Sequence, residues 1–150
     1  MITTWRIVKP DRASDAFSGK GARLFGGRWN SAGVSLVYTS STASLAALEI
    51  LVHLSGDDDL SGFLIFACSF SERLVDEITA DELPDDWRED DVAHFGDTWI
   101  KSESSAVLRV PSVIIDSEFN YLLNPAHRDF PKIEVRDPVP FSLDVRLLRR

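Results

Sequence analysis

Glu49 is the only carboxylate in the most hydrophobic stretch of this 150-residue chain, residues 43–54. An ionised carboxylate is costly in apolar surroundings unless other groups pair with it. Arg28 and Tyr38 precede it at nearly even spacing, the arginine after two glycines and the tyrosine at the end of an apolar segment. A guanidinium fork suits phosphate or carboxylate, and a phenol ring can stack on a flat ring. The three residues together are more typical of a site than of a surface.

The element expected to carry Glu49 is a helix over residues 43–54, with N-cap candidates in the polar cluster 39–42. On a helix, Thr42, Ala46, Glu49 and His53 share one narrow stripe, and most of the remaining girth is apolar. Such a stripe could line a cavity, with Ala46 leaving room for a ligand. The alternative is that the stripe faces water and Glu49 is on the wet side of the helix.

The other candidate residues also have ordinary structural explanations. Arg28 follows glycines that allow a tight backbone turn, but a hairpin turn with a surface arginine fits equally well. Tyr38 could stack on a ligand or fill the core. Ser112 follows a proline within an apolar segment, so its hydroxyl is expected to be inward and hydrogen-bonded. Since no glycine precedes it, it is no nucleophile elbow.

Composition excludes several classes of protein. A net charge of −8 and a pI near 4.8 argue against a nucleic-acid binder. The N-terminus does not resemble a signal peptide, and no apolar run reaches the roughly 18 residues that span a bilayer, so we expect a cytoplasmic protein. The single cysteine, Cys68, rules out an internal disulfide and a cysteine zinc site. No metal site is expected, because the histidines lack ligand spacing; they are His53, His94 and His127.

The pattern of elements predicts one α+β domain over residues 1–150, with small mixed or antiparallel sheets and few helices. Strands are expected at 3–8, 34–39, 63–70, 106–115 (interrupted at Pro111-Ser112), 132–135 and 141–148. A second helix is expected at 91–101. Loops are expected at 11–33, 81–91 and 120–129.

Several short motifs, in this order, resemble those of the RES domain family, named for its Arg, Glu and Ser. These positions fall on Arg28, Glu49 and Ser112. The matching segments are Trp5-Arg6-Ile7, Gly26-Gly27-Arg28-Trp29-Asn30, Val37-Tyr38, Ala47-Leu48-Glu49-Ile50-Leu51-Val52-His53, Phe95-Gly96-Asp97-Thr98-Trp99, Val110-Pro111-Ser112-Val113-Ile114 and Asn120-Tyr121-Leu122-Leu123-Asn124-Pro125.

The resemblance implies a toxin of a type II toxin–antitoxin system that depletes cellular NAD+ and has a fold similar to that of ADP-ribosyltransferase toxins. It implies a hetero-oligomer with a DNA-binding antitoxin of the Xre type, which covers the active-site entrance. Direct contact with nucleic acid or membrane is not expected. NAD+ would be the substrate, and no cofactor would be needed.

The same resemblance gives the candidate residues their roles. Glu49, Arg28 and Tyr38 would be catalytic: the carboxylate stabilises a ribosyl cation, and the tyrosine stacks on nicotinamide or fixes its ribose. Arg6 and Arg28 would hold the diphosphate. The side chains that would orient the amide or ribose by hydrogen bonds are Ser112 and Asn120 or Asn124.

The acceptor of the ADP-ribosyl group is left open between water and phosphate. Transfer to a protein is a first alternative. Such transferases often carry an acidic residue two positions before the catalytic glutamate, where this chain has Ala47, which favours a small acceptor. A non-enzymatic interaction module is a second alternative.

Overall fold

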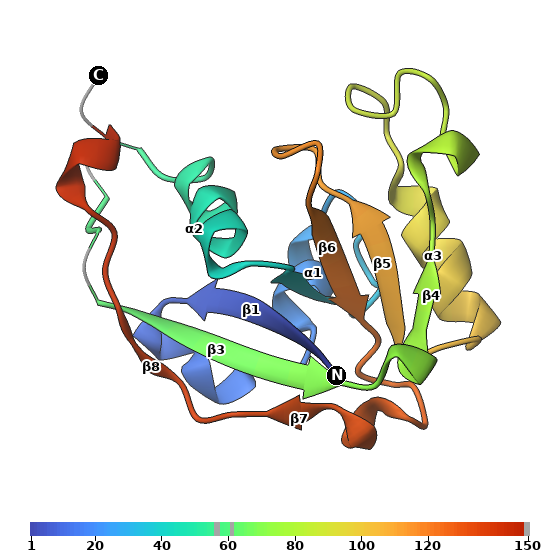
Figure 1. The fold of residues 1–150 in the computed structure, drawn as a ribbon, viewed down its shortest axis with the longest axis horizontal. Coiled ribbons are helices and arrows are strands. Elements are labelled where there is room, and N and C mark those ends of the chain that lie inside the picture. The colour runs from blue at the N-terminus through green and yellow to red at the C-terminus, as the bar shows by residue number, and fades with distance from the viewer. Residues whose placement is uncertain (56–57, 61, 149–150) are drawn as a thin grey trace.

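The computed structural model describes residues 1–55, 58–60 and 62–148, and within them the predicted α+β class is confirmed. Eight strands of the described residues form one mixed sheet in the order β4-β5-β6-β2-β1-β3-β7, with β8 also pairing with β3 (Figure 1). Among the strands that the structure describes, only β4 and β5 pair in parallel. The strands are β1 (Ile2–Val8), β2 (Val37–Ser40), β3 (Phe63–Phe70), β4 (Val75–Glu77), β5 (Val107–Pro111), β6 (Phe119–Leu123), β7 (Glu134–Val135) and β8 (Val139–Phe141). The helices are α1 (Lys20–Phe25), α2 (Ala43–Leu51) and α3 (Ala93–Ser102), with 3-10 turns η1 (Pro10–Asp15), η2 (Glu72–Leu74), η3 (Ala80–Glu82), η4 (Phe130–Lys132) and η5 (Val145–Leu148).

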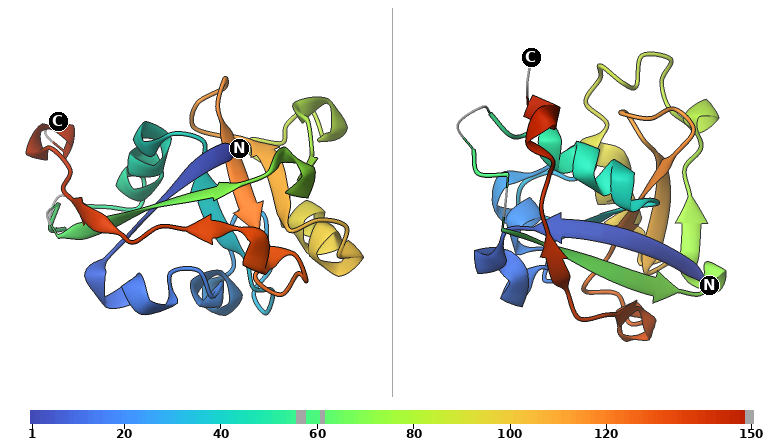
Figure 2. Two further views of the ribbon diagram at one scale, coloured as in Figure 1. Left: turned by 60° about the horizontal axis from the view of Figure 1, so that its bottom comes forward. Right: turned by 60° about the vertical axis from the view of Figure 1, so that its left-hand side comes forward.

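The sheet narrows to a single residue pair between β1 and β2. Trp5 pairs with Ser40 there, whereas β1 pairs with β3 along its whole length and β2 with β6 along all four of its residues. In Figure 1, β1 and β3 run across the view while β5 and β6 run nearly upright, and Figure 2 shows the same divergence from two other sides. We call this junction the seam. Past it β1 and β2 diverge.

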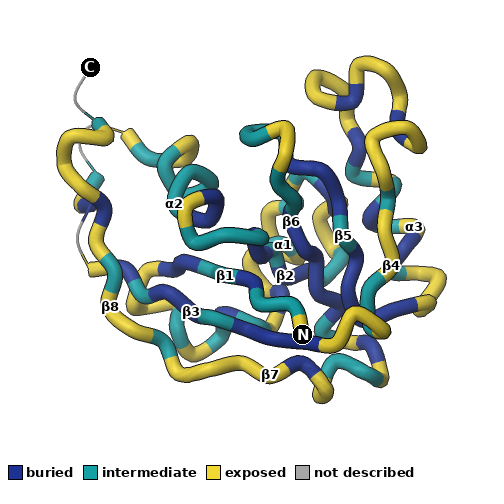
Figure 3. The backbone as a smooth tube through the Cα atoms, in the orientation of Figure 1, coloured by how far each residue is buried: buried dark blue, intermediate teal, exposed yellow. Residues whose placement is uncertain are grey.

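A hydrophobic cluster supports each side of the seam, and a third cluster, which includes Val37, Phe70, Val107 and Leu123, packs β2, β3, β5 and β6 together across it (Figure 3). One packs α2 against β1 and β3 through Ile7, Ala46, Phe63 and Ile65. Another packs α3 against β5 and β6, and its fully or nearly fully buried members include Trp29, Leu36, Trp87, Val92, Trp99, Leu108, Val110 and Leu122.

Helix α2 begins where the sequence predicts because Thr42 caps it. The Thr42 hydroxyl accepts a hydrogen bond from the Leu45 amide at 3.0 Å and donates to Glu118 Oε1 at 2.6 Å. The helix ends at Leu51, three residues before the predicted end. The predicted stop included Gly56, which lies outside the described residues. The strands near 3–8 and at 63–70 and the helix near 91–101 are confirmed, with shifts of one or two residues at their ends.

Other predicted elements were wrong. The predicted loop 11–33 contains η1 and α1, and the predicted loop 120–129 begins with β6. β6 is a central strand buried on both faces, so Tyr121-Leu122-Leu123 reads as a short apolar run without alternation, and its flanking asparagines resemble turn residues. Two further predicted strands were too long: 34–39 begins only at Val37, and 141–148 is strand only at Phe141 and ends in η5.

Candidate functional site

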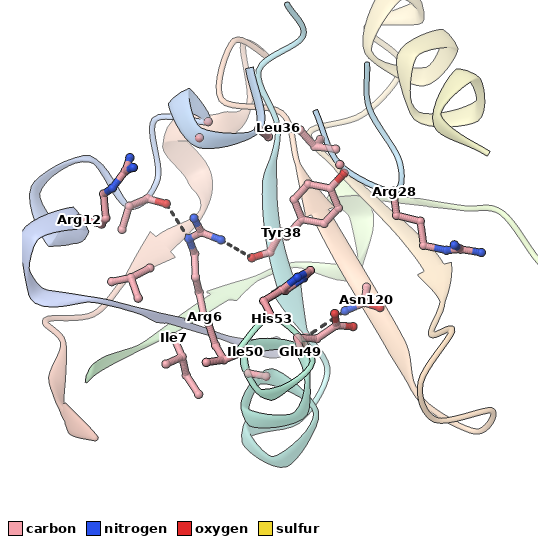
Figure 4. Close-up of a pocket in the computed structure, with 18 of the residues that line it drawn as sticks. Arg6, Ile7, Arg12, Arg28, Leu36, Tyr38, Glu49, Ile50, His53 and Asn120 are labelled. Carbon is pink, nitrogen blue, oxygen red and sulfur yellow. Dashed lines mark hydrogen bonds between the residues drawn. The ribbon is translucent and has the colours of Figure 1, made fainter. Parts of the chain in front are cut away.

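A cavity of about 810 Å³ opens where β1 and β2 separate, a volume in the range of small-molecule sites. Its walls come from β1, η1, α1, the turn before Trp29, β2, α2 and β6. Figure 4 shows Arg6, Arg28, Tyr38, Glu49 and Asn120 around it. These five predicted site residues are thus brought together by elements far apart in the sequence.

Glu49 projects from α2 at this cavity and is half-buried. Ala46 and His53, from the same helical stripe, also line the cavity, while Thr42 instead caps the helix. The side chain of Asn120 hydrogen-bonds the carboxylate (Figure 4). Burial raises the pKa of Glu49 above its usual value, and the Asn120 hydrogen bond, His53 and Arg28 oppose that shift. The stripe therefore faces a pocket rather than open solvent.

The hydroxyl of Tyr38 is fully engaged in the structure. It donates to Asn30 Oδ1 at 2.6 Å and accepts from the Trp29 amide at 3.0 Å. Burial raises the pKa of Tyr38 far above that of an ordinary phenol. The hydroxyl is therefore suited to fixing the ring in place rather than to exchanging a proton with a ligand.

Arg28 lies in a tight turn in which Gly27 and Asn30 exchange backbone hydrogen bonds of 3.0 and 3.4 Å. Gly27 has no room for a side chain, since a Cβ would lie 2.6 Å from the Tyr38 hydroxyl. The guanidinium stacks 5.4 Å from the centre of the Trp87 ring, and Nη2 donates to the Trp87 carbonyl at 2.5 Å. Its Nε is buried without a hydrogen-bond partner, and burial lowers the pKa of Arg28. The Arg28 side chain is only partly buried and lines the cavity, so guanidinium donors that Trp87 does not engage suit an incoming anion.

Arg6 bridges the seam. Its Nε donates to the Ala16 carbonyl at 2.7 Å and its Nη1 to the Tyr38 carbonyl at 3.0 Å, as the dashed lines in Figure 4 mark. Burial lowers the pKa of Arg6, and nearby Asp15 partly opposes the shift. An arginine has five N–H donors, so these two bonds leave others for a ligand. In Figure 4, Arg6 and Arg28 lie on opposite sides of Tyr38.

Asn30 holds this arrangement together, a role that the sequence analysis did not assign to it. It is 1% exposed, and its amide nitrogen donates to the carbonyls of Ala22, Ser31 and Val34 at 2.9, 3.1 and 3.0 Å. Its oxygen accepts from Tyr38. A polar residue directly after Gly-Gly-Arg-Trp was the available signal, because a buried amide must be satisfied on all sides.

Helix α3 clamps the Arg28 turn from outside the cavity. A Cβ on Gly96 would lie 1.7 Å from the Trp29 carbonyl oxygen, so only glycine allows this approach. Asp97 accepts hydrogen bonds from the Ser31 amide at 2.8 Å and the Ser31 hydroxyl at 2.5 Å. The Phe-Gly-Asp-Thr-Trp motif is thereby given a positioning role that periodicity did not reveal.

Ser112 and Asn124 do not line the cavity. The buried Ser112 hydroxyl accepts from the amides of Ile114 and Ile115, both at 3.0 Å, and so fixes the loop after β5. Because Ile114 and its neighbour Val113 line the cavity, Ser112 shapes the wall from behind. Asn124 Oδ1 accepts from the Ala126 amide at 3.0 Å and closes the turn after β6.

Within the described ranges, no three His, Cys, Asp or Glu side chains gather as a metal site. No helix in the same ranges has the length and apolar character needed to cross a membrane.

Comparison with known proteins gives consistent matches over nearly the whole chain. The RES domain matches residues 3–144. A protein named Toxin Res from Photorhabdus laumondii is 35% identical over 97% of this chain and 96% of its own length. A protein named Prs ADP-ribosylating toxin from Sphingobium sp. (strain YBL2) is 39% identical over 97% of this chain and 96% of its own. The crystal structure of the Mycobacterium tuberculosis MbcT–MbcA toxin–antitoxin complex contains a chain of similar fold, with a TM-score of 0.72, 18% identity and coverage of 98% and 86%.

Proposed function

Since the chain belongs to the RES domain family, we propose that it is a toxin that cleaves the bond between nicotinamide and ribose in NAD+. One observation carries this proposal: the half-buried carboxylate of Glu49, on α2, faces a dinucleotide-sized cavity that Arg6 and Arg28 also line, with Asp15 as the other acidic residue of its described lining. The protein would act on the NAD+ pool of the cytoplasm.

One carboxylate is sufficient for this chemistry. Most glycoside hydrolysis needs a second carboxylic acid to protonate the leaving group. Nicotinamide leaves NAD+ from an already cationic nitrogen, takes the bonding electron pair with it and departs neutral. The ribose carbon becomes a cation stabilised by its ring oxygen. The charge of Glu49 then stabilises that cation in a partly water-excluded site.

The remaining residues bind and orient the substrate. Arg6 and Arg28 hold the diphosphate with the donors left over from their protein contacts. The ring of Tyr38 stacks on the nicotinamide or packs against its ribose. Asn120 holds the Glu49 carboxylate and contacts the ribose. We assign the last two predicted residues to shaping loops around the cavity; they are Ser112 and Asn124.

Transfer of ADP-ribose to a protein is the second candidate, favoured by the relative named as an ADP-ribosylating toxin. Ala47 is not placed to act together with Glu49. Glu49 lies on a helix, where a residue two positions earlier points elsewhere, and Ala47 packs in the core with α2. Its identity therefore does not distinguish a small acceptor from a protein.

The test is to incubate the purified chain with NAD+ and follow nicotinamide, ADP-ribose, phosphorylated ADP-ribose and labelled protein. Free nicotinamide with ADP-ribose supports a glycohydrolase, and with phosphorylated ADP-ribose a phosphorylase. Free nicotinamide and labelled protein, without free ADP-ribose or phosphorylated ADP-ribose, support transfer. If no nicotinamide appears at high protein concentration, both catalytic proposals fail and the interaction module remains.

We further propose a DNA-binding antitoxin of the Xre type as the partner that blocks the cavity. Phe25 and Val52 line the cavity and are 77% and 61% exposed, and a partner would remove this apolar area from water. Co-purification of the two proteins followed by the nicotinamide assay tests this. A stable complex that releases nicotinamide at the rate of the free chain would contradict blocking.

A further inference from the structure

The charge of the cavity is opposite to that of the protein. Of the described residues that line it, five are lysine or arginine and two are acidic, although the chain as a whole carries −8. Arg6 and Arg28 are two of the five. The other three we call the basic end, which consists of Lys9, Arg12 and Lys20.

Three consecutive segments contribute the basic end to the wall of the cavity. Lys9 directly follows β1, Arg12 belongs to η1, and Lys20 opens α1. Figure 4 shows Arg12 on the side of Arg6 that faces away from Arg28. Asp15 is the acidic residue of this region that lines the cavity.

These cations form no ion pair with other described residues of the protein. The ion pairs found among the described residues are Arg88–Asp116, Arg109–Glu77, Lys132–Asp129 and Arg146–Asp144. Lys9, Arg12 and Lys20 take part in none of them. Three unpaired cations at a concave surface raise the local concentration of anions and suit a phosphate group.

We propose that the basic end binds the 2′-phosphate of NADP+, so that the protein cleaves NADP+ as well as NAD+. The inference rests on the proposed function. With the nicotinamide ribose at Glu49 and the diphosphate between Arg6 and Arg28, the adenosine half of the substrate extends past Arg6. A phosphate on the adenosine ribose then meets cations that NAD+ leaves without a partner.

The reaction on NADP+ is the same as on NAD+. The bond between the ribose carbon and the nicotinamide nitrogen breaks, and nicotinamide takes the electron pair. With water as acceptor, its oxygen forms the new bond to that carbon and a proton is released. The second product is ADP-ribose that keeps its 2′-phosphate.

The experiment compares kcat/KM for NADP+ and NAD+ from nicotinamide release. In the wild-type chain the two values should lie within about tenfold of each other. In the double variant Arg12→Ala/Lys20→Ala the NADP+ to NAD+ ratio should fall by roughly 10- to 100-fold, since a hydrogen bond to a charged group is worth about a factor of ten or more. The control Lys101→Ala/Arg128→Ala removes the same charge from exposed positions outside the cavity and should leave the ratio unchanged.

Each other outcome overturns a specific part. Cleavage of NAD+ with no measurable cleavage of NADP+ overturns this inference and leaves the proposed function standing. If the double variant keeps both the wild-type ratio of kcat/KM values and the wild-type rate on NADP+, the assignment of the 2′-phosphate site to the basic end is wrong. A wild-type NAD+ rate that rises with added inorganic phosphate, and no longer does so in the double variant, assigns the basic end to free phosphate instead. Failure to release nicotinamide from either dinucleotide overturns the proposed function itself.

Discussion

Glu49→Gln is the substitution that tests the proposed chemistry most directly. Glutamine keeps the shape of the side chain and can still hydrogen-bond Asn120, but it has no charge with which to stabilise a ribosyl cation. Substrate binding through Arg6 and Arg28 should remain. The expected result is a large loss of kcat with little change in KM.

The magnitude follows from the position of the carboxylate. Glu49 is half-buried at an open cavity, so an effective dielectric constant between those of water and a dry interior applies. Two unit charges about 4 Å apart at a dielectric constant of ~20 interact by about 4 kcal/mol. Because about 1.4 kcal/mol corresponds to a factor of ten in rate, kcat should fall by roughly 10³.

The assay is steady-state nicotinamide release, with Glu134→Gln as a matched control. Glu134 is exposed on β7 and does not line the cavity, so its variant removes the same charge without touching the site. Circular dichroism of both variants shows whether the fold is retained. A folded Glu49→Gln protein that keeps more than a tenth of the wild-type kcat would refute the electrostatic role.

Three further predictions concern pH, packing and binding. Because the pKa of Glu49 is raised in the fold, the folded state binds its proton more tightly than the unfolded chain, and the resulting stability is lost as pH rises through the raised pKa. Glu49→Gln should therefore have a higher Tm than wild type near neutral pH, and this difference in Tm should shrink below about pH 4.5. The same difference in Tm at neutral pH and below pH 4.5 would contradict this. Gly96→Ala should lower stability by about 2–3 kcal/mol through overpacking, a fall in Tm of very roughly 4–12 °C, whereas Gly21→Ala, whose Cβ meets nothing within 4 Å, should raise stability by about 0.5–1 kcal/mol in thermal melts. Arg28→Ala should raise KM for NAD+ by roughly 10- to 100-fold, and an unchanged KM, or an equal rise in Arg88→Ala outside the cavity, would displace Arg28 from the diphosphate.

The position of the helical stripe at the cavity could be predicted because it depends on local spacing. Helical spacing alone placed Ala46, Glu49 and His53 on one stripe, and the structure puts all three at the cavity. The Thr42 cap fixed where the helix begins, and therefore the direction in which Glu49 points.

The remaining parts of the site depend on contacts that span the chain. Asn30 owes its importance to Tyr38 and to three carbonyls in the folded turn. Gly96 is required by a backbone 67 positions earlier, at Trp29. The periodicity of the local sequence does not reveal such long-range contacts. Ser112 was expected to face inward and hydrogen-bond, and it does so, but toward its own loop rather than the cavity.

The one-pair seam between β1 and β2 has a consequence for how the molecule opens. A sheet normally transmits cooperativity through many adjacent ladder bonds, but across the seam the described strands are joined by the Trp5–Ser40 pair and by the Arg6 bond to the Tyr38 carbonyl. A hydrophobic cluster that includes Val37, Phe70 and Leu123 packs the two sides together. We therefore expect amides beside the seam to exchange through local openings that leave the shared core intact. A dinucleotide bound across the seam would contact β1 and β2 together and so connect them where they share no further backbone hydrogen bonds. Bound substrate would then slow amide hydrogen exchange in β1 and in β2 together. Binding at the narrowest part of the sheet would therefore stabilise the fold on both sides of it.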